Sequence, residues 1–400
     1  MCAVREKITI PVLLLLLALG GCASSELFEA EFRRFKEADV VAGWPEDEDM
    51  ANAEKATEFF LEEAGTKGVK FLFAKLDGSD GDKLYALEML RYYVSTPHRY
   101  SAPPFEIENS YKVRDKEKCA ELVRKGLQAN KHILYPDSPE DDTGLITCWV
   151  RKHFVELVSV AQAVELTDDI LKVMNNDPSL DVRAQVEWFL EECFEKLPEE
   201  LKKKTLDSVF KLFLSEPDAE QASKTTHFCV HEAGLSAVPY FVRTLLDPKL
   251  PQDRIGRILT IIMYEARGSK DRSWLQVLVF VMSEIEPAAI AAITQMEKLV
   301  LEEDRQNILA ATAAPPDRVS ASWMMWWQAN GRYLYYDAWK EKFSISKDAK
   351  KNGSPVDSAT GEPLRDKELK KTELKENELS SVLKKALSKG EGWHEKDKDK

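Results

Sequence analysis

The sequence predicts an all-α fold in which antiparallel helix pairs are stacked as an α-solenoid. Between residues 53 and 301, apolar residues recur at three- and four-residue spacing and strand-like alternation is rare. One helix pair cannot bury both of its faces, so a repeated pair indicates an array in which neighbouring pairs cover each other. Acidic or proline-marked helix starts recur in this segment at steps of 34 to 39 residues, at Asp142, Asp181, Asp218, Asp253 and Pro287.

The first 21 residues have the pattern of a secretion signal. Arg5 and Lys7 precede an apolar stretch, 8–19, that is shorter than the about 20 residues a membrane-spanning helix needs. The stretch closes with Leu19-Gly20-Gly21-Cys22, which resembles the lipobox of bacterial lipoproteins. The resemblance implies a signal peptide over 1–21 and acylation of Cys22. An ordinary secretion signal without acylation is the alternative.

The lipid anchor implies a place in the bacterial cell envelope, because two acyl chains make release into water unfavourable. Ala23, the residue after the cysteine, resembles the pattern of lipoproteins sent to the outer membrane, facing the periplasm or the cell surface. The inner membrane stays open as an alternative. Residues 22–52 are acidic and are predicted to form the anchor and a tether, with a first, poorly packed helix as the alternative. The net charge of −13 and the lack of a basic stripe predict no nucleic-acid partner.

Short motifs in the segment 53–301 resemble HEAT repeats. The stretch 177–183, Asp-Pro-Ser-Leu-Asp-Val-Arg, resembles the opening of the second helix of such a repeat, and 234–247 resembles a first helix. The resemblance implies that Asp181 caps its helix and that Arg183 lies along the interface with the neighbouring repeat. A carboxylate at an N-cap is worth about 1 kcal/mol. The prolines within 95–104 leave open whether the array is one block or two.

Residues 302–346 are rich in tryptophan and tyrosine. The order of a tryptophan-rich helix, Asn330-Gly331 and a Tyr-x-Tyr stretch resembles the segment that follows the repeats in bacterial HEAT-containing proteins. Large aromatic side chains suit the closing of the open end of a solenoid, so this segment is predicted to be a cap. Asn330-Gly331 is predicted to supply left-handed residues that end the helix. Stacking of Trp323 to Trp339 on a glycan is the alternative.

The remaining segment, 347–400, is rich in lysine, glutamate, glycine and proline. It is predicted to be a charged linker over 347–360 and then a solvated, largely disordered and partly helical tail. The only apolar stripe in it consists of Leu369, Leu374, Leu379, Leu383 and Leu387. Four cysteines remain in the predicted mature chain, and none has a metal-type or redox-type spacing. Buried free thiols and one or two disulfides of undetermined pairing both stay open for Cys119, Cys148, Cys193 and Cys229.

His227 and His231 form the one cluster with metal-ligand chemistry. On a helix they share a face, with Glu232 beside them, whereas Cys229 points away. The pattern is not His-Glu-x-x-His, and a third ligand has to come from elsewhere. These residues are a weak metal candidate, and interface histidines are the favoured interpretation. No catalytic residue and no cofactor are predicted.

We expect a lipid-anchored, non-enzymatic envelope scaffold that presents an acidic solenoid surface to a partner protein of unknown identity. Neither a nucleophile elbow nor a phosphate loop occurs, although an enzyme stays open. The alternative is an envelope enzyme or a glycan- or metal-binding protein. Its site would be the His227/His231 face or the aromatic segment 323–339.

Overall fold

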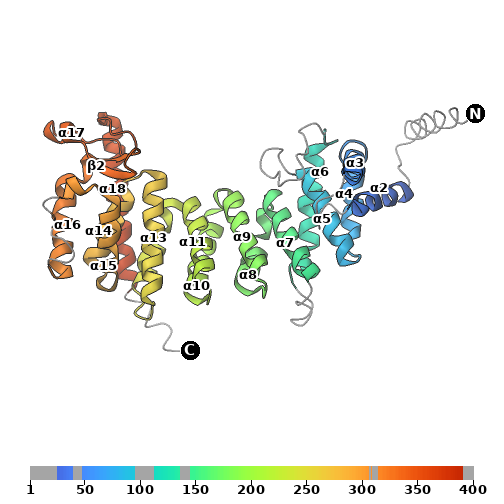
Figure 1. The fold of residues 1–400 in the computed structure, drawn as a ribbon, viewed down its shortest axis with the longest axis horizontal. Coiled ribbons are helices and arrows are strands. Elements are labelled where there is room, and N and C mark those ends of the chain that lie inside the picture. The colour runs from blue at the N-terminus through green and yellow to red at the C-terminus, as the bar shows by residue number, and fades with distance from the viewer. Residues whose placement is uncertain are drawn as a thin grey trace, which may run out of the picture. The chain divides into compact units, whose positions relative to one another are not determined.

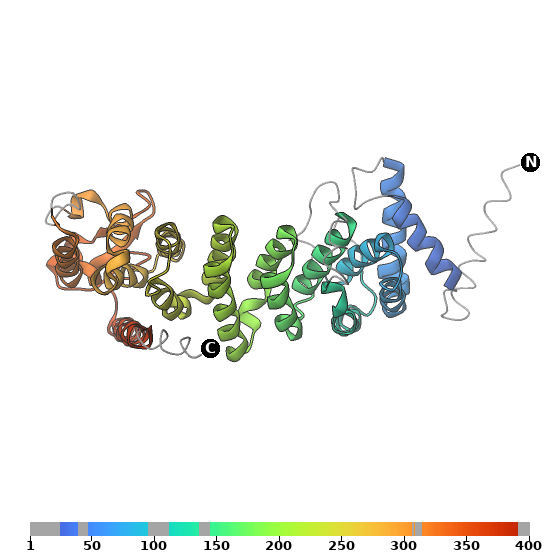
Figure 2. The same ribbon diagram turned by 90° about the horizontal axis from the view of Figure 1, so that it is seen from below.

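The computed structural model describes residues 25–38, 47–94, 112–135, 145–305, 308 and 314–390. The chain divides into two compact units, Met1–Lys196 (unit 1) and Leu197–Lys400 (unit 2), and each is described by itself. The predicted signal peptide, Cys22, Asp142 and the stretch 95–104 lie outside the described residues. Nearly all regular structure in the described ranges is helical, which confirms the all-α prediction (Figures 1 and 2).

In unit 1, helices from successive pairs pack in a row. α5 contacts α7 and α7 contacts α9, while α8 and α9 form an antiparallel pair. An aromatic cluster begins the core where Phe28 stacks on Phe71 at 5.2 Å and packs edge-on against Phe59 at 5.5 Å. The α-helices of unit 1 are α2 (Ser25–Glu37), α3 (Asp47–Glu58), α4 (Thr66–Lys75), α5 (Asp80–Val94), α6 (Lys116–Ala129), α7 (Leu145–Val160), α8 (Thr167–Asn176) and α9 (Leu180–Cys193).

In unit 2, α10 packs on α12, and α11, α13 and α15 follow one another in a second row. Rows of this kind are what stacked helix pairs require. The helices of unit 2 are α10 (Glu199–Ser215), α11 (Ala219–Ala233), α12 (Val238–Leu245), α13 (Gln252–Ser269), α14 (Ser273–Glu284), α15 (Ala289–Leu299), α16 (Pro316–Asn330), α17 (Lys347–Lys351) and α18 (Asp366–Gly390).

The helix starts expected from the sequence fall close to observed starts. Asp218 is the N-cap of α11, and its Oδ1 accepts hydrogen bonds from the amides of Glu220 and Gln221 at 2.9 and 3.0 Å. Asp253 lies in the first turn of α13, and Pro287 lies in the 3₁₀ turn that precedes α15. The repeat period is therefore reproduced within the described residues.

The capping role expected for Asp181 is not observed. The N-cap residue of α9 is Ser179, and Asp181 lies exposed in the first turn. Asp177 holds this loop instead, because its carboxylate accepts from the Ser179 amide at 2.9 Å and pairs with Arg151 of α7 at 2.9 Å. Arg183 donates to the Asp177 carbonyl at 2.7 Å. The helix start is thus fixed by a buried ion pair to another helix.

An arginine in unit 2 joins successive helix pairs. Arg254 of α13 is buried, and its guanidinium donates to the carbonyl of Phe213 at 2.8 Å and to that of Glu216, at the end of α10. A cation at a helix C-terminus satisfies carbonyl groups that the helix itself leaves without partners.

The aromatic segment forms helix α16 and a β-hairpin in unit 2. β1 (Leu334–Asp337) pairs antiparallel with β2 (Lys342–Ile345), in register Leu334↔Ile345. The prediction of left-handed residues at Asn330-Gly331 is wrong, because both residues have negative φ angles, −125° and −50°. Gly331 is needed for space instead, since an added Cβ would lie 3.0 Å from the Trp327 ring.

The segment after residue 346 differs from the expected disordered tail over its described part, up to residue 390. α17 is followed by a turn with a bridge between Val356 and Pro363, and then by the 25-residue helix α18. α18 packs on α12 and α14, in dark red beside the yellow and orange helices in Figure 2. Its apolar residues Leu379, Leu383 and Ala386 are buried, which composition alone does not reveal.

The four described cysteines are free thiols, and Cys119, Cys193 and Cys229 are buried. Burial raises the pKa of Cys119 to about 11 and that of Cys193 to about 12. No single described helix is long and apolar enough to cross a membrane. The consecutive helices Ser273–Glu284 and Glu286–Leu299 pass together by length and composition, but they are bent by 117°.

Candidate functional site

The first candidate surface lies where α11 meets α13 in unit 2. His227 and His231, one turn apart on α11, face Glu265 of α13. Oε1 of Glu265 lies 3.3 Å from Nε2 of His227 and 3.5 Å from Nδ1 of His231. The Glu265 side chain is 4 % exposed, whereas the two histidines are 42 % and 64 % exposed. We call these three residues and Tyr264 the histidine face.

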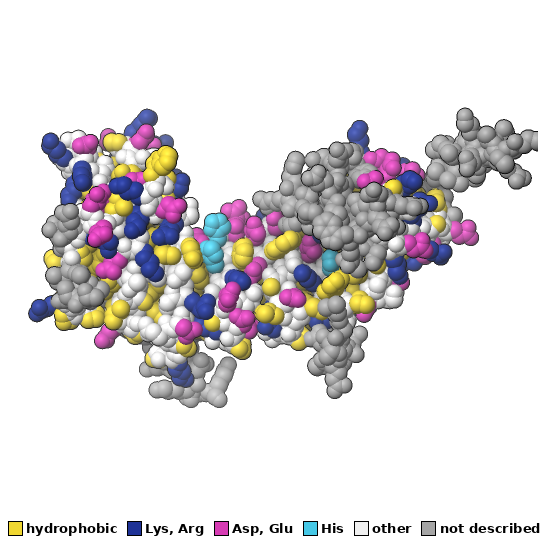
Figure 3. Space-filling model, viewed as in Figure 1, with side chains coloured by type: hydrophobic (Ala, Val, Ile, Leu, Met, Phe, Trp, Pro, Cys, Tyr) yellow, Lys and Arg dark blue, Asp and Glu magenta, His cyan; other side chains and the backbone are white. Residues whose placement is uncertain are grey.

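Tyr264 extends the histidine face toward solvent. It is 51 % exposed, and its ring centroid lies 5.7 Å from that of His227. Figure 3 shows histidine side chains at the surface beside hydrophobic ones on this side of unit 2. The face therefore combines an accessible aromatic ring, two ring nitrogens and a carboxylate on two packed helices.

Glu265 explains why two histidines stand at this position. Burying a carboxylate is costly unless hydrogen-bond donors or charges compensate it, and the imidazole rings are its neighbours on α11. Sequence reasoning missed Glu265 because it lies in the next helix pair, and only the repeat period connects the two positions. Cys229 is fully buried, in agreement with its expected direction away from His227. Within the described ranges, no three or more His, Cys, Asp or Glu residues are arranged to hold a metal ion.

The aromatic segment is mostly core. Trp323 is fully buried and packs edge-on against Trp326 at 5.3 Å, and Trp326 Nε1 donates to the Asp304 carbonyl at 2.8 Å. Trp339 differs, since it lies in the turn between β1 and β2 and is 98 % exposed. Asp337 Oδ1 accepts from the Trp339 amide at 3.0 Å and so fixes the turn. Trp339 is therefore the ring of this segment that is open to a flat ligand.

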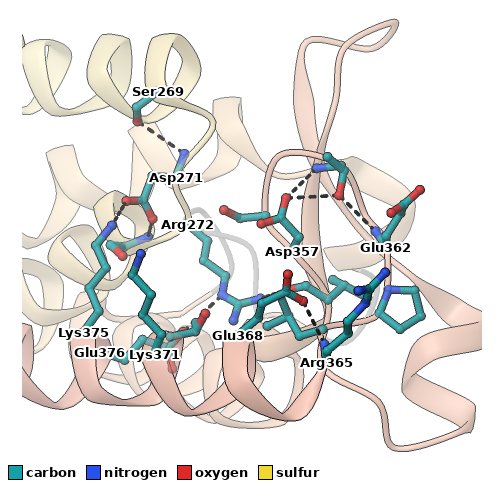
Figure 4. A pocket seen from close by; sticks show the side chains of 17 residues that line it. Ser269, Asp271, Arg272, Asp357, Glu362, Arg365, Glu368, Lys371, Lys375 and Glu376 are labelled. Carbon is teal, nitrogen blue, oxygen red and sulfur yellow. Dashed lines mark hydrogen bonds and ion pairs between the residues drawn. The ribbon is translucent and has the colours of Figure 1, made fainter.

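The second candidate surface of unit 2 is a cleft of about 630 Å³ (Figure 4). It lies between the α13–α14 turn (269–273), the loop 356–365 and the first half of α18. Lys375 of α18 reaches Asp271 at 2.6 Å, and Lys371 rises from the same helix into the cleft. Burial alone would raise the pKa of Asp271, but the hydrogen bonds from Lys375 and Ser273 hold this pKa below its usual value.

Arg272 joins the three walls of the cleft. Its Nε donates to Glu376 of α18 at 3.1 Å, and its Nη1 donates to the carbonyls of Arg332 and Val356 at 2.9 and 2.8 Å. The side chain is 4 % exposed. On the loop, Asp357 accepts from the amides of Ala359 and Thr360 at 3.0 and 2.9 Å. The charges of this cleft are therefore largely used to dock α18 and to fix the loop.

Unit 1 contains a buried charge cluster between α5 and α7. Arg91 pairs with Glu88 at 3.0 Å and with Glu156 at 2.6 Å. His153 Nδ1 lies 3.7 Å from a carboxylate oxygen of each glutamate. Burial lowers the pKa of His153 although both carboxylates act to raise it. The cluster joins two helices, and its histidine favours the neutral form.

No protein-family model matches the sequence, and no curated protein matches it.

Proposed function

We propose that this protein is a non-enzymatic scaffold of the bacterial envelope, anchored through a lipidated Cys22, and that its HEAT-like array binds a partner protein through the histidine face. The observation that carries the proposal is Tyr264, an exposed aromatic side chain on α13 beside two partly exposed histidines of α11. Tyrosine is enriched among the residues that dominate protein interfaces, because it offers large contact area and a polar end.

The chemistry of the histidine face favours a partner surface that carries hydrogen-bond donors or a cation. The negative charge of the buried Glu265 carboxylate attracts a cationic group of a partner to the surface beside the two rings. The net charge of −13 acts in the same direction over longer range. A basic or helical segment of the partner is the expected contact.

A photo-crosslinking experiment tests the proposal in the native envelope. A photoreactive residue replaces Tyr264, and a matched control places it at Leu214, which is 45 % exposed on α10 of the same unit. We expect one reproducible protein adduct from position 264 and none from position 214. Equal adducts from both positions, or none from 264 while the protein stays folded, would contradict the proposal.

Mass spectrometry of the N-terminal peptide from the same preparation tests the anchor. A diacylated Cys22 is expected, and an unmodified N-terminus would remove the envelope anchor from the proposal. The histidine face is tested separately by His227→Ala/His231→Ala, which is expected to weaken the adduct and to leave metal content unchanged.

The exposed Trp339 favours a second candidate function, stacking on a sugar ring of an envelope glycan. Trp339→Ala would then abolish retention on the glycan while the crosslink from position 264 persists. Retention that is unchanged by Trp339→Ala would remove this candidate.

A further inference from the structure

We propose that α18 is a displaceable internal ligand, and that the groove it fills on α12 and α14 receives an amphipathic helix of a partner protein. The inference goes beyond the histidine face, because it concerns other helices of unit 2. We call the surface of α12 and α14 beneath α18 the α18 groove.

The apolar part of the contact between α18 and the α18 groove is a short stripe of residues on α18. Leu379, Leu383 and Ala386, at spacings of four and three residues, are 5 %, 1 % and 7 % exposed. This is the spacing of one face of a helix laid in a groove. α12 buries six of its eight residues and α14 eight of its twelve. α18 is therefore one of the elements that keep these two helices from solvent.

The polar part of this contact lies one turn before the apolar stripe. Asp271 and Arg272 at the start of α14 bind Lys375 and Glu376 of α18 at 2.6 and 3.1 Å. Gln276 Nε2 of α14 donates to Ser380 Oγ at 2.8 Å, and also to the Glu376 carbonyl. These contacts select for a basic residue at the position of Lys375 and an acidic residue at that of Glu376. They also fix the position of the helix along its axis.

α18 buries a smaller share of its residues than the array helices do. Among residues 366–388, the part of α18 whose burial is described, these three are buried, whereas α13 buries nine of 18. The first half of α18 borders the open cleft, so its residues are mostly exposed (Figure 4). The sequence of α18 is rich in Lys, Leu and Glu, strong helix formers that favour a helical conformation in a released segment.

The α18 groove defines the partner that fits it. A competing helix needs apolar residues at i, i+4 and i+7, with a basic and an acidic residue one turn earlier to meet Asp271 and Arg272. The partner is a protein helix, because the pattern reads side chains along one helix face.

A peptide-binding experiment on the full chain tests the proposal. In the variant Leu379→Asp/Leu383→Asp, buried charges release α18 from the groove. A fluorescent peptide of residues 366–390 is then expected to bind this variant at least tenfold more tightly than the wild type, whose groove is filled. The matched control Leu374→Asp changes a leucine that is 59 % exposed, and it should leave the groove closed.

The same substitutions in the peptide give the second control. A peptide with Leu374→Asp should bind as the native peptide does, and one with Leu379→Asp/Leu383→Asp should not bind. The proposal is overturned if the released variant, with its other helices intact by circular dichroism, does not bind the native peptide. Equal binding by wild type and variant overturns it as well.

Hydrogen exchange of the wild-type protein tests displacement without any variant. Amides of α18 are expected to exchange at least tenfold faster than those of α13, and excess peptide should accelerate them further. Exchange of α18 as slow as that of α13 would contradict the proposal. Concentration-dependent dimers that disappear in Leu379→Asp/Leu383→Asp would assign the groove to a second copy and so overturn it. None of these results depends on the crosslink from position 264, so the two proposals fail independently.

Discussion

Asp177→Ala in unit 1 should be one of the most damaging single substitutions at a charged residue. The Asp177 carboxylate and the Arg151 guanidinium lie 2.9 Å apart, and their side chains are 1 % and 2 % exposed. The carboxylate also accepts the Ser179 amide at the start of α9. Removing it takes this ion pair away from the buried Arg151 guanidinium and removes the acceptor of the Ser179 amide.

The expected loss in the free energy of unfolding of unit 1 is about 3–5 kcal/mol, the usual cost of breaking a buried ion pair from one side. Replacing both partners, as in Arg151→Met/Asp177→Leu, should recover much of this loss because no buried charge then remains. Asp181→Ala is the matched control. Asp181 is exposed in the first turn of the same helix, where a carboxylate contributes below about 1 kcal/mol.

Urea unfolding at pH 7 measures these differences, and hydrogen exchange of α7 to α9 assigns them to unit 1, since two units need not unfold together. If Asp177→Ala costs less than about 1 kcal/mol, or if Asp181→Ala costs as much as Asp177→Ala, the assignment of the loop to Asp177 is refuted.

Three further predictions concern other sites. Because the pKa of His153 is lowered by burial, the unfolded chain takes up its proton first as the pH falls, so unit 1 should lose stability below about pH 6.5. His153→Gln should lose less between pH 7 and pH 5 in urea titrations, and an identical loss would refute this. Asp218→Ala should lower the melting temperature by removal of the α11 cap, measured by thermal unfolding, and no change would exclude the cap. Trp323→Ala should cost about 3–5 kcal/mol and Trp339→Ala less than about 0.5, and similar costs in urea unfolding would contradict their burial.

The architecture could be predicted from the sequence because it depends on local spacing. The three- and four-residue periodicity marks the helices, and Asp218 stands where an N-cap was expected. The ion pair between Arg151 and Asp177 could not be predicted, since its members are 26 residues apart and only packing brings them together. The contact of Glu265 with His227 and His231 could not be predicted for the same reason.

The tail shows how composition can mislead. Leucines at helical spacing were visible in the sequence, but the highly charged background predicts a solvated segment. The structure buries Leu379 and Leu383 and leaves Leu374 exposed. Which leucines dock is decided by the groove on α12 and α14, and that surface exists only after the array has folded.

The ordered connection between α17 and α18 has a consequence for any partner helix. Arg272 binds the Val356 carbonyl, so the chain that leads to α18 starts from a fixed point beside the groove. A short tether of this kind gives the attached helix an effective concentration on the order of millimolar. A partner helix of equal intrinsic affinity displaces α18 only when its own local concentration reaches this value. A partner anchored to the same surface would reach it, whereas a freely diffusing partner would not.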